Sequence, residues 1–265
     1  MPTAHDDRYR PTRRRVLRDL GDAGLLGAAL AAAGSGLLAG SPLAATPALA
    51  AACTLTAEQE EGPYYLDLEK IRRNVTEGRA GLRLDLEITI VDSTTCRPIE
   101  GVAVDIWHCD AGGVYSGFSA EGTKGRTYLR GVQLTDAGGT ATFRTIYPGW
   151  YQGRATHIHL KAHVGGKSGA STYSGGHVAH TGQVFFSDTI TDRVAKLSPY
   201  TTDKVVRTRN AADRVYTQQG GAGLKLALTR HRAGTITSGF KGAITLGLDP
   251  SATPAAAGGG GGGGR

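Results

Sequence analysis

The chain has 265 residues, a formal net charge of +7 and three cysteines. The basic surplus lies mostly within residues 193–232, and neither a recognition motif nor interleaved aromatic residues accompanies it. This argues against a nucleic-acid-binding function and favours a solvated basic face. A weak attraction for anionic aromatic acids is a second interpretation of the same charge.

The first 51 residues have the layout of an export signal. Paired arginines lie within 12–18, an Ala/Leu/Gly-rich run extends over about 23–43, and a small-x-small pattern follows at 48–50. The pattern predicts a twin-arginine-type signal peptide over 1–51 and an exported mature protein. A membrane anchor or a disordered arm is the alternative, but the run is too weakly hydrophobic for a permanent span, so no stable span is expected after processing.

Residues 52–250 are predicted to form one domain of ordinary size. The segment that follows, 251–265, contains alanine and proline and then a run of glycines. Such a run cannot bury apolar surface, so we expect a disordered tail or linker.

Short strands dominate the domain. Residues 82–90 alternate apolar and polar side chains without a fault, which predicts a strand with one face on a core. Residues 136–139 have the composition of a hairpin turn between two further strands. Strands are also predicted over 102–107, 131–134, 140–146, 156–164, 183–187, 224–229 and 243–248, and short helices over 56–61, 190–197 and 210–216. These elements predict an all-β fold, a β-sandwich of mostly antiparallel short strands with few short helices.

The three cysteines suit an exported protein in which two of them pair. Cys96 and Cys109 lie on neighbouring predicted strands, so a disulfide between them is favoured. Cys53 is then left over, directly after the cleavage zone. Lipid attachment at Cys53 is an alternative, although the leucine usual three places earlier is absent.

A metal site is suggested by His157 and His159, which are two residues apart in a predicted strand. Both imidazoles then point to one face, about 6–7 Å apart at Cα, which suits two nitrogens on one metal. No Asp or Glu occurs between 155 and 187, which disfavours a two-His-one-carboxylate site. Tyr147 and Tyr151 precede the pair in a Pro/Gly-containing loop and are candidate ligands. His108, His163, His177 and His180 are interpreted as non-ligands, the last two in a mobile surface loop.

Four segments resemble motifs of the intradiol ring-cleaving dioxygenases. Residues 148–159 (PGWYQGRATHIH) are similar to that family's stretch with a ligand tyrosine, an arginine and the H-x-H pair, and 105–116 to the segment that ends in a second ligand tyrosine. Residues 61–65 and 181–186 resemble two further motifs. Their order along 53–248 makes the resemblance specific, and it is closest to the exported, single-domain members, with a sandwich of prealbumin-like type.

The resemblance implies iron(III) bound by Tyr115, Tyr151, His157 and His159. Two phenolates and two imidazoles are a hard, electron-rich set, and only a strongly Lewis-acidic cation holds tyrosine as phenolate at neutral pH. Tyr151 is expected to leave the metal when a catechol chelates. Arg154 is expected to stabilise developing negative charge. Substrate contacts are assigned to Gln183, Tyr64 and Tyr65.

The expected activity is cleavage of catechol-type rings between the two hydroxyls, with O2, to give muconic acids. The partners are then a small catechol-type molecule and O2, with no nucleic acid, and a homo-oligomer is left open. One alternative is an exported sandwich that binds an aromatic or carbohydrate ligand without turnover, because fold alone does not separate the two. A zinc or copper hydrolase built on the H-x-H pair is a weaker third hypothesis.

Overall fold

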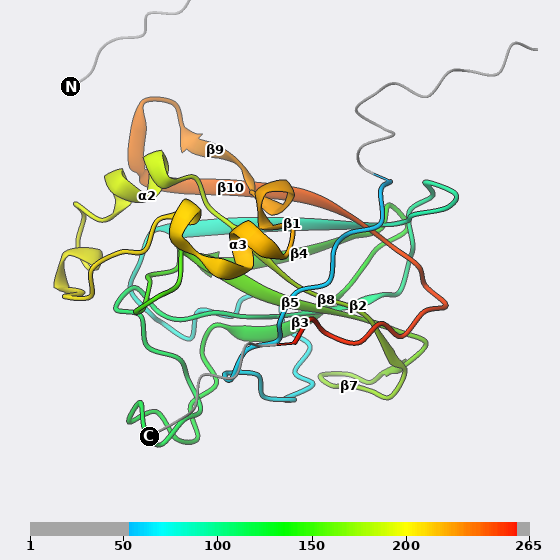
Figure 1. Ribbon diagram of the computed structural model, residues 1–265. Coiled ribbons are helices and arrows are strands. Elements are labelled where there is room, and N and C mark those ends of the chain that lie inside the picture. Colours follow the sequence, from blue (N-terminus) through cyan, green and yellow to red (C-terminus); the bar gives the residue numbers. More distant parts are fainter. Residues whose placement is uncertain (1–52, 259–265) are drawn as a thin grey trace, which may run out of the picture. The chain divides into compact units, whose positions relative to one another are not determined.

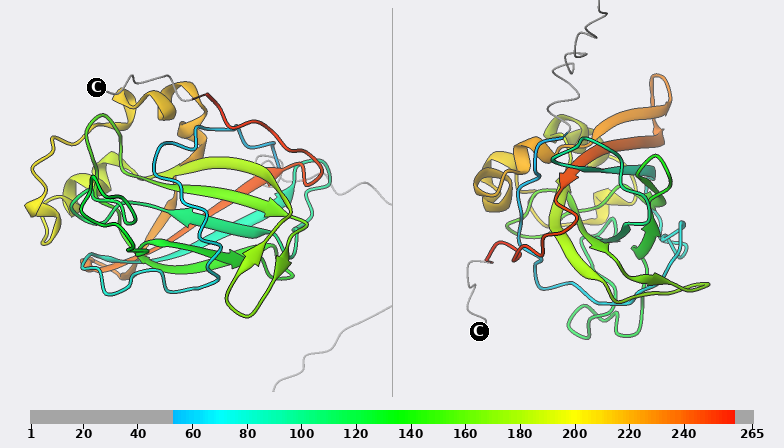
Figure 2. Two further views of the ribbon diagram at one scale, coloured as in Figure 1. Left: turned by 90° about the horizontal axis from the view of Figure 1, so that it is seen from below. Right: turned by 90° about the vertical axis from the view of Figure 1, so that its right-hand side faces the viewer.

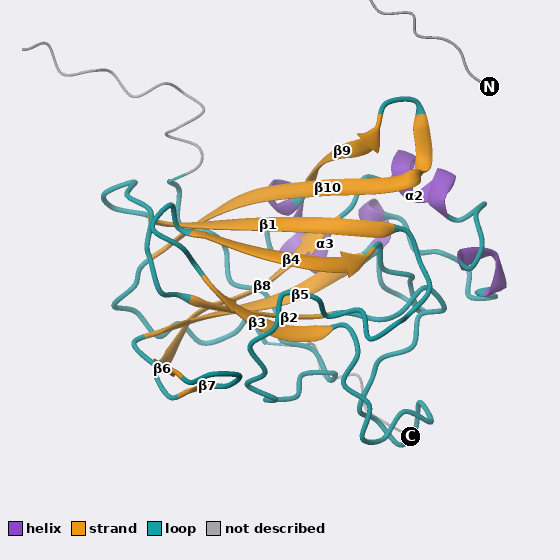
Figure 3. Cartoon of the chain, turned by 180° about the vertical axis from the view of Figure 1, so that it is seen from behind, coloured by secondary structure: helices purple, strands orange, loops and turns teal. Residues whose placement is uncertain are grey.

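A computed structural model describes residues 53–258, and within them two four-stranded sheets are stacked as layers (Figures 1 and 3). The predicted signal peptide (1–51) and most of the glycine run lie outside the described residues. In the described part, no helix is long and apolar enough to cross a membrane. The prediction of an all-β sandwich with few short helices is confirmed.

The first sheet has the order β4-β1-β10-β9 and the second has the order β3-β2-β5-β8. All neighbouring pairs are antiparallel except β1 and β10, which are parallel. A two-stranded ribbon, β6–β7, lies apart from both sheets. The strands are β1 (Arg83–Asp92), β2 (Ala103–Trp107), β3 (Arg130–Leu134), β4 (Thr140–Ile146), β5 (His157–Val164), β6 (Lys167–Ser168), β7 (Tyr173–Ser174), β8 (His177–Phe185), β9 (Ala227–Arg232) and β10 (Thr235–Leu248).

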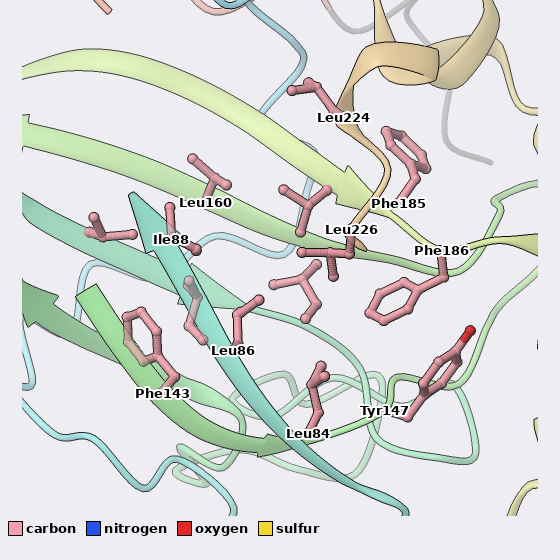
Figure 4. Packing of buried hydrophobic residues seen from close by; sticks show 14 of the residues in the cluster. Leu84, Leu86, Ile88, Phe143, Tyr147, Leu160, Phe185, Phe186, Leu224 and Leu226 are labelled. Atoms are coloured by element: carbon pink, nitrogen blue, oxygen red, sulfur yellow. The ribbon is translucent and has the colours of Figure 1, made fainter. Parts of the chain in front are cut away.

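The core lies between the two sheets, and alternation along the strands explains it. In β1 the alternate side chains from Leu84 to Ile90 are fully buried, whereas Arg83 is exposed. From the other sheet, Ile158 and Leu160 of β5 point into the same core (Figure 4 labels Leu84 and Leu160). His157 and His159, which alternate with these β5 residues, therefore lie on the outer face of the second sheet, away from the core.

The turn at 136–139 is present but does not close a hairpin within one sheet. Gly139 N donates to Asp136 O at 2.8 Å, and Asp136 N donates to Thr140 O at 3.1 Å. The flanking strands β3 and β4 belong to different sheets. The expectation of a hairpin is thus wrong, because a local turn signal specifies a chain reversal and does not specify which strand becomes the partner.

The helical elements are short, and one predicted helix is absent. The predictions at 190–197 and 210–216 correspond to α2 (Asp188–Val194) and to η2 (Asn210–Ala212) with α3 (Arg214–Gln218). The remaining elements are η1 (Tyr200–Thr202) and η3 (Gly221–Leu224). Residues 56–61 form no helix. Their backbone pairs with strands instead, since Thr56 N donates to Gly247 O at 2.7 Å and Gln59 N to Thr181 O at 2.9 Å.

This N-terminal arm covers the outer face of the second sheet (Figure 2). Near its start, Glu60 O accepts a hydrogen bond from Gln183 Nε2 of β8 at 2.9 Å. Further along the arm, Ile71 forms a parallel bridge with Val132 of β3. The arm turns an otherwise open sheet face into an enclosed space. The outward-facing histidines of β5 are buried for this reason.

The disulfide joins Cys53 to Cys96, with 5.1 Å between the Cα atoms, and Cys109 is a buried free thiol. The predicted Cys96–Cys109 bridge is therefore wrong. Cys96 lies in the turn after β1, whereas Cys109 follows the far end of β2, so the length of β2 separates them. The bond also takes up the Cys53 sulfur, which is then not available for the lipid attachment left as an alternative.

Loss of this disulfide is expected to lower stability substantially, because it closes a loop of sequence separation 43. Chain-entropy arguments give about 2–4 kcal/mol for the Cys53→Ser/Cys96→Ser protein, a fall in Tm of roughly 5–15 °C. Thermal unfolding of that variant and of reductant-treated native protein should agree. A Tm that the reductant leaves unchanged would contradict the Cys53–Cys96 pairing.

Candidate metal centre and active site

The site begins with a row of side chains across the second sheet. His159 of β5 lies directly opposite Trp107 of β2 on one side and Gln183 of β8 on the other. Directly opposed residues of neighbouring strands point to the same face. The indole ring of Trp107 stacks on His159 with 4.9 Å between centroids and 8° between planes, which holds the imidazole in one orientation.

The two tyrosines reach this row from separate loops that pack backbone against backbone. Gly149 N donates to Asp110 O at 3.0 Å, and a Cβ at Gly149 would lie 2.5 Å from the same oxygen. Gly113 adopts φ +83°, and a Cβ there would lie 2.2 Å from Trp150 O. Only glycine permits this approach, which brings the loop of Tyr115 against the loop of Tyr151.

Four donor groups converge where the loops meet the strand. His157 Nε2 lies 3.0 Å from His159 Nε2 and 3.3 Å from the Tyr151 hydroxyl. The ring of Tyr115 lies 5.6 Å from that of Tyr151 and 6.3 Å from that of His159, centroid to centroid. The structure thus brings together all four residues proposed as ligands from the sequence.

Burial sets the protonation of the four groups. It lowers the pKa of both His157 and His159. The positive charge of Arg154 lowers both further, and His157 also lowers the pKa of His159. Burial raises the pKa of Tyr115 and Tyr151 above the usual range. At neutral pH the protein alone therefore presents neutral imidazoles and protonated phenols.

This donor set fits a strongly Lewis-acidic metal ion. His157 Nδ1 lies 2.6 Å from Ala155 O, which directs the Nε2 lone pair toward His159. The Tyr115 hydroxyl is buried and lacks a hydrogen-bond partner of acceptable geometry. Among residues 53–258 no group of three or more His, Cys, Asp or Glu is placed to hold a metal. The tyrosines are therefore needed to complete a ligand set, and a cation satisfies both the facing lone pairs and the orphaned hydroxyl.

Arg154 is held beside the ligands by a buried carboxylate. Its Nε donates to Asp213 Oδ2 at 2.9 Å, and another guanidinium nitrogen donates to Gln183 Oε1. Glu60 Oε1 lies 3.7 Å from the guanidinium. Asp213 has no exposed side-chain surface and also accepts from Ala155 N at 2.8 Å and Tyr216 N at 3.0 Å.

Asp213 was not identified from the sequence. The helix predicted over 210–216 places this residue in its interior, whereas in the structure Asp213 is the N-cap of α3, a position where aspartate is common. Nothing in the sequence pairs position 213 with position 154. Gln183, by contrast, was proposed beside the substrate, and it lies on the ligand face where it contacts Arg154.

The two tyrosines of the arm differ in position. Tyr64 stacks on Tyr115 with 4.2 Å between centroids and meets Tyr151 edge-on at 5.9 Å. Tyr65 packs against Trp107 at 4.8 Å, and Lys161 Nζ lies 3.6 Å from its ring centroid. Tyr64 therefore covers the ligands, whereas Tyr65 lies behind Trp107.

Tyr147 and the histidines outside the proposed ligand set have other contacts. Tyr147 is buried in the core, where its hydroxyl lies 2.7 Å from Thr191 Oγ1 (Figure 4). His108 is satisfied by Cys109 O and Thr145 Oγ1. His163 lies beside Tyr173. The expectation of a mobile surface loop is wrong for His177 and His180, because both lie in β8. His180 is buried against Glu58, and His177 is half-buried with its Nε2 3.1 Å from Pro250 O.

Arg130 ties the arm to the Tyr115 loop. This buried guanidinium donates to Tyr64 O at 2.8 Å, to Ser116 O at 2.8 Å and to Ser116 Oγ at 2.9 Å. Tyr64 is one member of the stacked Tyr64–Tyr115 pair, and Ser116 directly follows the other member in the chain. Arg130 thereby fixes the backbone on both sides of that stack.

We expect Arg130→Met to destabilise the protein by about 3 kcal/mol, because it leaves buried acceptors unpaired. For a domain of this size Tm falls by roughly 6–12 °C. Arg126→Met, at an exposed position of the neighbouring loop, is the matched control and should change Tm little. Equal Tm for the two variants would show that the three hydrogen bonds contribute nothing.

Together, fold and site define a β-sandwich whose outer sheet face carries a two-tyrosine, two-histidine centre. A family model described as Dioxygenase matches residues 60–195. An intradiol ring-cleavage dioxygenase from Tetranychus urticae is similar in structure, with a TM-score of 0.68, 33% sequence identity, and coverage of 76% of this chain and 98% of that one. The chain belongs to the intradiol ring-cleavage dioxygenase family.

Two further relatives are more distant. The dioxygenase domain of a dioxygenase and carbohydrate-binding protein fusion from Streptomyces sp. SirexAA-E has a TM-score of 0.52 and 28% identity, with 74% of this chain and 98% of that domain covered. Catechol 1,2-dioxygenase 1 of Acinetobacter lwoffii is 33% identical over 98 residues, a match that spans 34% of this chain and 30% of that protein.

Proposed function

We propose that the protein is an iron(III)-dependent dioxygenase that cleaves catechol-type rings between their hydroxyls with O2 to give muconic acids. The observation that carries the proposal is the convergence of Tyr115, Tyr151, His157 and His159, with Arg154 held beside them. Membership of the dioxygenase family supports the reaction class. When bound, the iron would act as a template and Lewis acid for a chelating substrate.

The four side chains would hold the ion, and they differ in freedom to move. Tyr115 is 1% exposed and stacked under Tyr64, whereas Tyr151 is partly exposed and lies in a loop with Gly153 at φ +79°. Tyr151 is thus the tyrosine better able to withdraw from the ion, and the oxygen of its phenolate form would then take up a substrate proton. His157 and His159 remain neutral donors throughout.

Arg154 supplies a fixed positive charge where the ring accumulates negative charge. Its side chain is 15% exposed, so water screens the charge little. The stacked rings of Tyr64 and Trp107 exclude water on two sides of the ligands. A preformed charge in a dry site stabilises the transition state without reorganisation.

A binding module without turnover is the competing function. Such a protein has no use for orphaned donors facing one point, nor for an arginine held by a buried carboxylate at a solvation cost. The zinc or copper hydrolase is disfavoured because the H-x-H pair comes with two phenols and without a carboxylate among the ligands.

The visible spectrum of the purified protein separates these functions. We expect a broad red-purple band from tyrosinate–iron(III), which shifts when catechol is added under air and decays as muconate absorbance grows. A protein that stays colourless after iron reconstitution would contradict the ligand assignment and favour the binding module. Zinc-dependent hydrolysis without colour would favour the third hypothesis.

We also propose export through the twin-arginine signal. The signal pattern at 12–18 supports it, as does the Cys53–Cys96 disulfide, because such bonds persist in oxidising compartments. Cell fractionation is the test: replacement of Arg13 and Arg14 by lysine should retain the protein in the cytoplasm. Native protein that is itself found only in the cytoplasm would overturn the proposal.

A further inference from the structure

A cavity of about 410 Å³ is lined by residues of α2 and of the β9–β10 hairpin, and none of its lining residues belongs to the metal centre. Figures 1 and 3 show α2 beside this hairpin. Its walls combine an apolar surface with two arginines. The lining includes Ile190, Arg193, Leu228, Arg230, Ile236 and Phe240.

The register of the hairpin places the lining side chains on one face. Leu228 lies opposite Gly242, and Arg230 lies opposite Phe240, so these side chains share one face. A Cβ at Gly242 would lie 3.1 Å from Leu228 Cδ2, so Leu228 packs over this glycine. Phe240 is 2% exposed and forms the buried end, whereas Leu228 and Ile236 remain half-buried. Their remaining apolar surface favours a ligand that covers it.

No carboxylate pairs with the two arginines of the cavity. Within the part of the chain that the structure describes, Arg193 and Arg230 form no ion pair, whereas Arg207, Arg209 and Arg214 of the basic segment pair with carboxylates. Arg232, outside the cavity, is likewise without an ion pair among the described residues. Two guanidinium groups beside an apolar wall match a ligand with a carboxylate at one end and an apolar body, because guanidinium binds carboxylate bidentately and stacks on flat rings.

We propose that this cavity binds aromatic carboxylates, with the ring against Leu228, Ile236 and Phe240 and the carboxylate between Arg193 and Arg230. Its volume lies within the range of small-molecule sites and exceeds that of a single-ring acid. The site is independent of the metal centre. It gives the basic surplus of residues 193–232 a definite location for anionic aromatic acids.

The test uses metal-free protein, labelled with ¹⁵N and titrated with cinnamate, so that chelation at the metal centre cannot contribute. We expect amide shifts at Ile190, Leu228 and Ile236. Arg193→Gln and Arg230→Gln should each weaken binding about tenfold, and neutral cinnamamide should bind at least tenfold more weakly, since each loses a charged hydrogen bond. Arg232→Gln, on the same strand outside the cavity, is the matched control and should bind normally.

Three outcomes would overturn the proposal. Shifts confined to the surroundings of Arg154 would assign the acid to the active site, and equal binding of cinnamamide would remove the role of the arginines. Inorganic sulfate that binds as well as cinnamate would indicate a general anion site. Ile236→Asp provides a check that does not depend on the arginines: it should abolish binding while the amide spectrum remains that of the folded protein. A native dimer that this change dissociates would instead identify the face as a self-association surface.

Discussion

Replacement of His159 by alanine is expected to leave a folded protein that no longer holds iron. The imidazole is 1% exposed and its Nε2 faces that of His157 at 3.0 Å, so its loss removes one of four ligands. Changes in the surroundings of a metal already cost 10–100-fold in affinity, and loss of a ligand should exceed about a hundredfold. Iron content, the intensity of the visible band and ring-cleavage rate are the measurements.

His163→Ala is the matched control for this prediction. His163 lies four residues further along β5 and its ring is 6.1 Å from that of Tyr173, outside the ligand group. It should keep full iron content and at least half of the activity. Stoichiometric iron in His159→Ala would remove this residue from the ligand set, while an equal loss in both variants would point to a general effect on β5.

Replacement of Asp213 by asparagine is expected to lower the turnover rate by about 10–100-fold while iron stays bound. The buried carboxylate holds Arg154 Nε at 2.9 Å and Ala155 N at 2.8 Å, and an amide places N–H donors against that guanidinium. Removal of one preorganised charge contact at a reacting centre has effects of this size or larger. The measurements are kcat, KM and the visible band of each protein.

Glu60→Gln is the control, because Glu60 contacts the same guanidinium only at 3.7 Å and also pairs with the more exposed Arg214. Its effect on kcat should be several-fold smaller. If Asp213→Asn keeps the native kcat, Arg154 does not depend on this carboxylate. If the variant loses iron, Asp213 acts on the metal loop rather than through Arg154.

We expect the contribution of the Asp213 carboxylate to stability to depend on pH. Burial raises the pKa of Asp213, but Arg154 and the backbone N–H donors outweigh it, so the folded-state pKa is lowered. The stabilisation is therefore fully present above the unfolded pKa of about 4 and is lost as pH falls through the lower folded value. The Tm difference between native protein and Asp213→Asn should be largest near neutral pH and shrink in acid.

Local sequence patterns were sufficient for most of the strands and for the two histidines among the proposed ligands. Alternation along 82–90 predicts β1 because burial of one sheet face requires it, and the H-x-H spacing places both imidazoles on one face. The two tyrosines were identified by family resemblance, not by spacing. Their approach depends on two close backbone contacts, of Gly113 with Trp150 and of Gly149 with Asp110, which no local pattern reports.

The remaining features were decided by long-range packing. Cys96 bonds to Cys53 of the N-terminal arm. The turn at 136–139 connects strands of different sheets, and Asp213 contacts Arg154, 59 residues earlier in the chain. The class of fold could be predicted from the amino-acid sequence because periodicity is a local property, and the proposed ligands came from the H-x-H spacing together with the family resemblance. Strand pairing, the choice of bonded cysteines and the carboxylate that holds Arg154 could not be predicted, because they depend on how distant segments pack together in the folded protein.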